Sequence, residues 1–270
     1  MKPDEVDFLA ELMRVRAGHA IDRDKTYLME SRLAPVTRRE GFASIREMLG
    51  VIRQRGDDRL AWCVVEAMAA GETSFFRDRK PFQVFREDML PALAKARRGE
   101  PIRIWSAGCA TGQEAYSIAM TLDEENAQHE GVSANILGSD LSSRALEKAQ
   151  SGLYTQFEIQ RGLPIRLLVK YFERHDEMWT LTPRLRSMVS WKRMNLNADF
   201  STLGRFDVIF CRNVARQMEP AAARRLLDQM ARALPRDGYL VLGAGEQGTD
   251  ALRPLGDGVY APNPAVAAAA

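Results

Sequence analysis

The chain has 270 residues, enough for one large domain or for a medium domain with a small one. Its apolar fraction of 46% and charged fraction of 27% are ordinary for a soluble globular protein. A net charge of +2 argues against a nucleic-acid binder, which would carry a clear excess of Lys and Arg. Cys63, Cys109 and Cys211 have no CxxC spacing, which disfavours a zinc site or a disulfide framework.

The N-terminus lacks the pattern of a signal peptide, and no apolar stretch approaches the ~20 residues that a membrane-spanning helix needs. We therefore expect a cytoplasmic protein that does not insert into a membrane. Residues 1–70 are predicted to form a small helical domain, because apolar residues recur at helical spacing in 8–15, 45–52 and 60–68 without strand alternation. Pro35 is expected to bend or interrupt the helix that begins near Lys25.

After a linker at 71–82, residues 83–270 are predicted to form an α/β domain. Short β-type runs at 102–105, 135–138, 206–210 and 238–242 alternate with helical runs. This order predicts a parallel, Rossmann-like sheet that binds ligands at the carboxyl ends of its strands. Two further strand-like stretches, 177–182 and 188–194, predict a hairpin in a small antiparallel β subdomain at about 165–195.

The first chemical motif runs from Trp105 to Tyr116, where a strand enters a loop with Gly108 and Gly112 and the loop opens a helix. Glycines there allow a sharp turn and a close approach of the backbone to a ligand. An ordinary strand–helix turn explains this segment equally well. The spacing is not GxGxxG, so a nicotinamide cofactor is not favoured.

Polar residues also follow the next strands. Asp140 ends the second strand, where an acid can accept hydrogen bonds from both hydroxyls of a ribose, although Asp140, Ser142 or Ser143 could instead cap the following helix. Arg212 and Asn213 follow the apolar run 206–210 and could bind a carboxylate or another polar end of a ligand. The weaker alternative is a solvated strand end.

The fourth motif, 71–78, places two aromatic residues before Arg77 where the helical part gives way to the α/β part. It suggests a linker packed against the ligand cleft, and the alternative is an ordinary amphipathic linker.

Taken together, the four motifs resemble the chemotaxis receptor glutamate O-methyltransferase family, CheR-type. The resemblance covers nearly the whole chain and keeps the family's order of helical domain, linker, α/β domain and inserted β subdomain. It implies a bacterial enzyme that transfers a methyl group from S-adenosylmethionine to glutamate side chains on the cytoplasmic helices of methyl-accepting chemotaxis receptors. The products are glutamate methyl esters and S-adenosylhomocysteine, formed in sensory adaptation.

The residues that the resemblance assigns to the cofactor are Thr73, Arg77, Glu114, Asp140, Asn195, Leu196, Arg212 and Asn213. Thr73 and Arg77 would close over it, Glu114 would hold its charged amino-acid end, and Asp140 its ribose. Asn195 and Leu196 would flank the adenine.

Arg212 and Asn213 would lie near the sulfonium end, which makes Arg77 and Arg212 the implied catalytic residues. A metal is not required, because a glutamate with a pKa of about 4.3 is already ionised at neutral pH.

The resemblance also implies how receptors are bound. Arg32, Arg38 and Arg39 would face the acidic methylation helices, although Glu30 and Glu40 lie alongside and a solvated charged surface is the alternative. The predicted hairpin could bind a receptor's C-terminal tail by adding an edge strand.

Four departures from the family pattern leave other functions open: Gly71 for Asn, Gln113-Glu114-Ala115 for Glu-Glu-Pro, Gln217 for a tyrosine near the transferred methyl, and Ala244-Gly245 for His-Ser. One alternative is a non-catalytic sensor or scaffold that still binds S-adenosylmethionine. Another is a methyltransferase acting on a small molecule or a nucleic acid.

Overall fold

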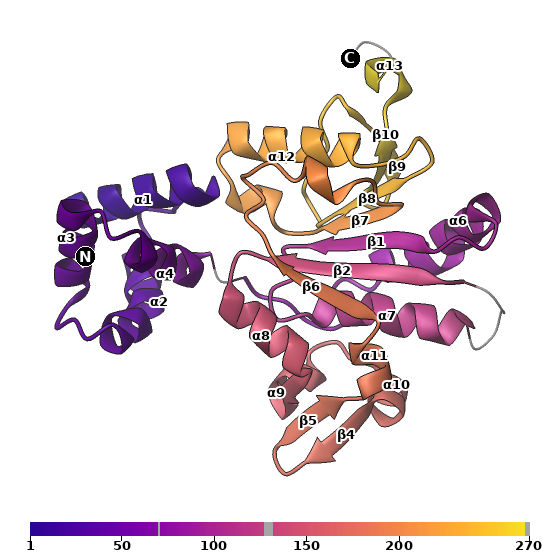
Figure 1. Ribbon diagram of the computed structural model, residues 1–270, viewed down its shortest axis with the longest axis horizontal. Coiled ribbons are helices and arrows are strands. Elements are labelled where there is room, and N and C mark those ends of the chain that lie inside the picture. Colours follow the sequence, from indigo (N-terminus) through magenta and orange to yellow (C-terminus); the bar gives the residue numbers. More distant parts are fainter. Residues whose placement is uncertain (70, 127–131, 268–270) are drawn as a thin grey trace. The chain divides into compact units, whose positions relative to one another are not determined.

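The computed structural model describes residues 1–69, 71–126 and 132–267 (Figure 1). The chain divides into two compact units, and each is described by itself. The N-terminal unit comprises residues 1–70 together with 216–224, and the second unit comprises 71–215 with 225–270.

The N-terminal unit is built on four helices: α1 (Pro3–Ala17), α2 (Thr26–Arg39), α3 (Ile45–Arg55) and α4 (Asp58–Met68). Each buries one apolar face, represented by Leu9, Leu33, Met48 and Val64, which are all fully buried. Side-chain caps start two of them: the Ser44 hydroxyl accepts from the Glu47 amide at α3, and Asp57 accepts from the Leu60 amide at α4. The predicted helical domain is confirmed.

Helix α2 differs from the expectation at Pro35, because it continues without interruption from Thr26 to Arg39. Proline lacks the amide hydrogen that the helix would use at this position. However, Met29, Leu33 and Val36 are buried on the inner face of α2, and tertiary packing supplies most of a helix's stability.

The second unit contains a seven-stranded sheet in the order β6-β2-β1-β7-β8-β10-β9. Its strands are β1 (Ile102–Ala107), β2 (Ala134–Asp140), β6 (Val189–Arg193), β7 (Val208–Cys211), β8 (Tyr239–Leu242), β9 (Leu252–Gly256) and β10 (Val259–Pro262). The first five strands in that order are parallel, whereas β10 pairs antiparallel with both β8 and β9. The predicted α/β architecture is confirmed, with a mixed rather than wholly parallel sheet.

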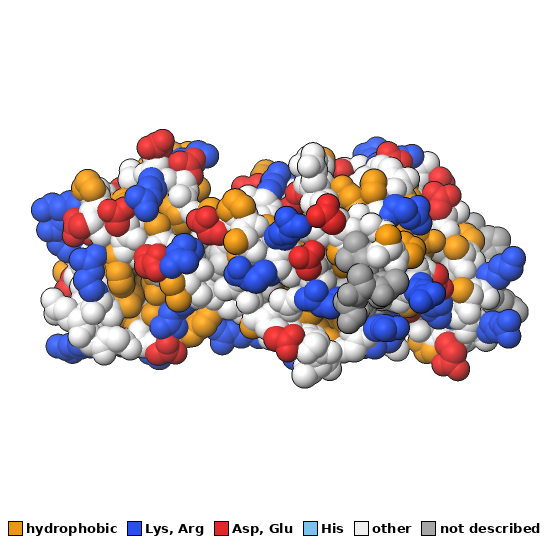
Figure 2. All heavy atoms as spheres, turned by 90° about the horizontal axis from the view of Figure 1, so that it is seen from above, with side chains coloured by type: hydrophobic (Ala, Val, Ile, Leu, Met, Phe, Trp, Pro, Cys, Tyr) orange, Lys and Arg blue, Asp and Glu red, His pale blue; other side chains and the backbone are white. Residues whose placement is uncertain are grey.

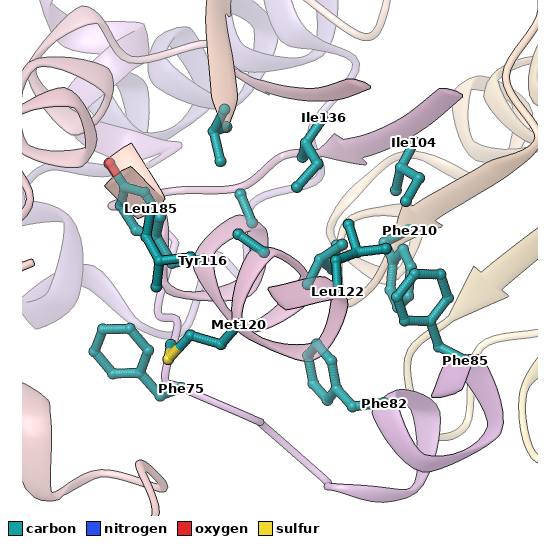
Figure 3. Packing of buried hydrophobic residues seen from close by; sticks show 14 of the residues in the cluster. Phe75, Phe82, Phe85, Ile104, Tyr116, Met120, Leu122, Ile136, Leu185 and Phe210 are labelled. Carbon is teal, nitrogen blue, oxygen red and sulfur yellow. The ribbon is translucent and has the colours of Figure 1, made fainter. Parts of the chain in front are cut away.

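Helices cover both faces of this sheet, and Figure 1 shows α7 and α12 on opposite sides. The described helical segments that follow α4 are α5 (Lys80–Val84), the π-helix η1 (Phe85–Met89), α6 (Leu90–Arg97), α7 (Gln113–Asn126), α8 (Ser143–Ser151), α9 (Gln156–Gln160), α10 (Ile165–Tyr171), α11 (Pro183–Arg186), η2 (Ser201–Leu203), η3 (Ala215–Gln217), α12 (Pro220–Arg232) and α13 (Pro264–Ala267). Side chains from α7, β1, β2 and β7 form the core drawn in Figure 3.

The predicted hairpin of 177–182 and 188–194 is wrong in its pairing. The small antiparallel sheet consists of β3 (Leu153–Thr155), β5 (Met178–Leu181) and β4 (Phe172–His175), in that order. Strand β6 instead joins the main sheet parallel to β2, with Gly138 opposite Trp191. A Cβ atom at Gly138 would lie 2.4 Å from the Trp191 ring, so the absence of a side chain at Gly138 makes room for this partly buried indole.

Candidate functional site

The predicted cofactor residues of the sheet come together at one edge. Asp140 ends β2, Asn195 and Leu196 follow β6, and Arg212 and Asn213 follow β7. These strands and β1 are neighbours and parallel, so their carboxyl ends meet at the same edge. Ligands of open α/β sheets bind at this edge.

Asp140 is joined to the glycine loop that follows β1. Its Oδ2 accepts a hydrogen bond from the Ala110 amide at 2.8 Å, and its Oδ1 accepts from the Ser142 amide at 2.9 Å. The helix cap is Ser142, whose hydroxyl accepts from the Ala145 amide. The capping alternative therefore belongs to Ser142, and Asp140 presents a half-buried carboxylate at the loop.

Asn195 and Leu196 lie beside Asp140, because the Met194 amide donates to the Asp140 carbonyl at 2.9 Å. The Asn195 side chain turns back to accept from the Asn197 amide at 3.0 Å. Both residues are half-buried. The structure thus places this pair next to Asp140, the residue predicted to bind the ribose.

Glu114 and Arg212 form a buried ion pair, with Arg212 Nη1 3.2 Å from Glu114 Oε2. The Ser106 hydroxyl donates to Glu114 Oε1 at 2.8 Å. Burial raises the pKa of the Glu114 carboxyl above its ordinary value, and the positive charge of Arg212 opposes this shift. Arg212 Nε is also buried and has no hydrogen-bond partner among the described residues.

The other arm of Arg212 holds the linker. Its Nη2 donates to the Arg77 carbonyl at 2.8 Å and to Asp78 Oδ2 at 2.6 Å. The Arg77 guanidinium is half-buried and donates to the Glu72 carbonyl at 3.0 Å. Thr73 lines a cleft of about 430 Å³ with Thr111 of the glycine loop, so both predicted linker residues lie in the same unit as the sheet edge.

Sequence reasoning missed two acids of this site. Asp78 stands in a motif that was singled out only for its aromatic residues and Arg77. Glu246 accepts from the amides of Asn213 at 2.8 Å and Gly243 at 2.7 Å, and Asn213 has the left-handed φ of 63°. A Cβ atom at Gly243 would lie 2.5 Å from the side-chain amide nitrogen Nδ2 of Asn213. Gly243 and Glu246, the two residues of 243–246 that match the family pattern, therefore shape this loop.

The predicted receptor-binding residues all lie on α2, in the N-terminal unit. Arg32 donates to the Met68 carbonyl, and Arg39 pairs with Glu40, which also pairs with Arg59. Arg38 is exposed, and the described residues offer it neither a hydrogen bond nor an ion pair. Of the three arginines, Arg38 is therefore the one whose charge is most available to a binding partner.

Gln217, at the family's tyrosine position, belongs to a segment that packs with the N-terminal helices. Its carbonyl accepts from the Ala20 amide at 2.9 Å. Its side chain lines a cleft of about 140 Å³ together with Arg32 and His19. This departure therefore belongs to the helical unit.

Two features are absent from the described residues. These residues contain no group of three or more His, Cys, Asp or Glu side chains arranged to hold a metal ion. Among these residues there is also no helix with the length and apolar character that crossing a bilayer requires.

Comparison with known proteins assigns both parts of the chain to one family. Residues 4–68 match the CheR methyltransferase all-alpha domain, and residues 71–252 match the CheR methyltransferase SAM binding domain. The chain belongs to the CheR methyltransferase family. The predicted family and its cofactor, S-adenosylmethionine, are thereby confirmed.

Curated relatives cover nearly the same length as this family member. The chemotaxis protein methyltransferase 1 of Pseudomonas aeruginosa is 37% identical over 91% of this chain and 92% of its own. The chemotaxis protein methyltransferase 1 of Vibrio cholerae is 37% identical over 86% of this chain and 84% of its own. This CheR family member is an S-adenosylmethionine-dependent methyltransferase of the chemotaxis type, as predicted.

The chemistry of the site fits S-adenosylmethionine. The cofactor carries two ribose hydroxyls, a positively charged amino group and a carboxylate. A carboxylate oxygen can accept more than one hydrogen bond, so Asp140 can take the ribose while it holds the glycine loop. Glu114 would hold the amino group of the cofactor. The buried Arg212 Nε–H has no acceptor among the described residues, and the cofactor's carboxylate could accept its hydrogen bond.

Glu114 predicts how binding to this CheR methyltransferase depends on pH. An exposed glutamate takes up a proton near pH 4.3, roughly its ordinary pKa. Because the pKa of Glu114 is raised, its carboxylate takes up a proton at a higher pH than that. Because the ionised form attracts the cofactor's amino group, we expect full S-adenosylhomocysteine affinity above the raised pKa and declining affinity as the pH falls through it.

Calorimetric titration across pH 4–7 measures this decline. Glu114→Gln should bind weakly with a flat profile, while Glu147→Gln, an exposed control on α8, should keep the wild-type curve. An unchanged pH profile in Glu114→Gln would show that this carboxyl does not hold the cofactor.

Proposed function

We propose that this enzyme transfers the methyl group of S-adenosylmethionine to glutamate side chains of chemotaxis receptors in the cytoplasm, giving glutamate methyl esters and S-adenosylhomocysteine in sensory adaptation. The observation that carries the proposal is the convergence of Asp140, Asn195 and the Glu114–Arg212 pair at the carboxyl edge of the sheet. The names of the relatives, which are chemotaxis protein methyltransferases, support the choice of substrate.

When bound, the cofactor supplies a methyl group on a sulfonium, which is a good electrophile. The acceptor carboxylate is ionised at neutral pH, so the protein need not remove a proton. Its task is to orient the two reactants and exclude water, which can lower a barrier by about 7–11 kcal/mol. Asp140 would hold the ribose of the cofactor and Glu114 its amino group. The linker residues would then orient the methyl group toward the acceptor.

The two arginines proposed for catalysis have different roles on this reading. Arg77 is half-buried on the linker and is the candidate to touch the acceptor carboxylate. The Arg212 side chain is only 1% exposed and binds Glu114 and Asp78. Arg212 would therefore act mainly by positioning Glu114 and the linker, and only its Nε would contact the cofactor.

Receptor helices are proposed to bind α2 of the helical unit through Arg32, Arg38 and Arg39. Figure 2 shows basic and acidic side chains interspersed on the face in view. Arg38, exposed and without an ion pair among the described residues, is the residue whose charge an acidic helix would meet.

Charge reversal at Arg38 tests this assignment. We expect Arg38→Glu to raise the KM for receptor by about threefold to tenfold, through loss of one attraction and gain of one repulsion, and to leave the KM for S-adenosylmethionine unchanged. Steady-state methylation with each substrate varied in turn measures both constants. Arg55→Glu, at an exposed arginine that ends α3, is the matched control. Equal effects of the two reversals would mean that α2 is not the receptor surface.

A receptor's C-terminal tail is proposed as a second contact, through addition of a strand to the small sheet. Strand β5 lies between β3 and β4, so the tail would pair with β3 or β4. The exposed side chains of Leu153 in β3 and Phe157 in α9 offer apolar contacts to such a strand.

The proposed function is tested with methyl-labelled cofactor and membranes that contain receptors. Base-labile label on receptor glutamates is the expected result, and receptors without their tails should accept less label if the small sheet binds the tail. Label that enters RNA or metabolites, with none in receptors, would contradict the proposed substrate. Full cofactor affinity without turnover on any receptor would contradict the proposed reaction.

A further inference from the structure

The segment 72–78, called the strap below, has an unusual backbone around its C-terminal end. Phe76, Asp78 and Arg79 have φ angles of 47°, 66° and 44°, in the left-handed region that residues other than glycine rarely adopt. Such a conformation persists only where surrounding contacts enforce it, and it is frequent at ligand clamps. The contacts of the strap therefore show what holds it in place.

One anchor of the strap is apolar. Phe75 is fully buried and meets the rings of Tyr154 and Phe172 edge-on, with centroids 5.1 and 5.6 Å apart (Figure 3 shows Phe75 at the core). The Phe76 amide donates to the Ser117 hydroxyl of α7 at 2.9 Å. At Gly162, a Cβ atom would lie 2.1 Å from the Phe75 carbonyl oxygen, so the strap runs against bare backbone there.

The other anchor is ionic and reaches the cofactor-binding acid. Arg212 Nη2 binds the Arg77 carbonyl and Asp78 Oδ2, while Nη1 of the same guanidinium binds Glu114. The Arg212 side chain is 1% exposed and lies over the Phe82 ring, whereas the Asp78 side chain is 46% exposed. Asp78 thus supplies, from the solvent side, the second counter-charge for a buried cation shared with Glu114.

We propose that Asp78 is a positioning residue for methyl transfer: through Arg212 it holds the strap, and with it Thr73 and Arg77, in register with Glu114. This inference rests on the proposed function, because the strap residues are those expected to cover S-adenosylmethionine. Without the Asp78 charge, the Arg212 guanidinium has Glu114 as its one remaining charged partner among its described contacts. The strap then loses its ionic anchor, and Glu114 is drawn more strongly into neutralising Arg212.

The test compares Asp78→Asn with Asp88→Asn, an exposed aspartate ten residues further along. Loss of one charge-assisted hydrogen bond should weaken S-adenosylhomocysteine binding about 10- to 100-fold in Asp78→Asn and leave Asp88→Asn like the wild type. The KM for S-adenosylmethionine should rise, the KM for receptor should stay constant, and Asp78→Glu should restore part of the affinity. Thermal unfolding of ligand-free Asp78→Asn should be lowered only slightly, because Asp78 is half-exposed and Arg212 keeps its ion pair with Glu114.

A double variant examines the link through Arg212. Asp78→Asn and Glu114→Gln act on the same guanidinium, so their combined effect on affinity should differ from the product of the single effects by more than about threefold. Independent effects, wild-type affinity in Asp78→Asn, or a loss of affinity that merely follows a lower unfolding temperature would each overturn the inference. Failure of the wild type to bind S-adenosylhomocysteine would overturn the proposed function and this inference with it.

Discussion

Asp140→Ala is expected to abolish measurable binding of S-adenosylhomocysteine. The substitution removes the carboxylate that is proposed to accept hydrogen bonds from the ribose, and hydrogen bonds to a charged group contribute about 1.5–3 kcal/mol each. The Ala110 amide of the glycine loop would also lose its acceptor, so the loop that follows β1 loses its tie to β2. Two such losses correspond to a decrease in affinity of at least about 100-fold. Calorimetric titration of the purified protein measures it.

A conservative variant at Asp140 and a control at another aspartate accompany Asp140→Ala. Asp140→Asn keeps one carbonyl acceptor in the same place, so we expect an intermediate affinity. Asp88→Ala removes an exposed aspartate from η1 and should bind as the wild type does. Normal binding and normal methyl transfer by Asp140→Ala would show that the ribose is held elsewhere, and the assignment of the whole sheet edge would have to be withdrawn.

Phe75→Ala is expected to produce the largest loss of stability, about 3–5 kcal/mol in the free energy of unfolding. The ring is fully buried and packs edge-on against Tyr154 and Phe172, so its removal leaves a cavity between the strap and the small sheet. Urea denaturation followed by circular dichroism measures the loss. Cofactor affinity should fall as well, because the apolar anchor of the strap is gone.

Phe157→Ala is the matched control for this substitution. The Phe157 side chain is 67% exposed on α9, and its truncation should change the unfolding free energy by no more than about 0.5 kcal/mol. If Phe75→Ala were as mild as Phe157→Ala, the packing around the strap would be too loose to position Thr73 and Arg77.

Much of the fold was open to prediction because its signals are local. Helical spacing of apolar residues identified α1, α3 and α4, and alternation of apolar runs with helical stretches identified β1, β2, β7 and β8. The ends of these strands also follow from the sequence, and so do the polar residues placed there. Asp140, Arg212 and Asn213 were therefore expected at one edge, since parallel strands end together.

Pairing over long distances could not be predicted in the same way. The stretch 188–194 has the composition of a strand, but its partner is β2, about fifty residues earlier, and not the stretch at 177–182. A strand pattern specifies which side chains are buried and leaves the neighbouring strand open. The fit of Trp191 over Gly138 decides the neighbour, and that fit exists only once both strands are in place.

By itself, the sequence determined the helical domain, the strand order in the chain and the polar residues that end the strands, because periodicity and strand length act over a few residues. Only the tertiary structure decided what each of those residues does. It gave the helix cap to Ser142 and left Asp140 to the glycine loop, and it joined Arg212 to Glu114 and Asp78, which lie 98 and 134 positions away. A buried guanidinium must have counter-charges, and which acids supply them depends on how the chain packs.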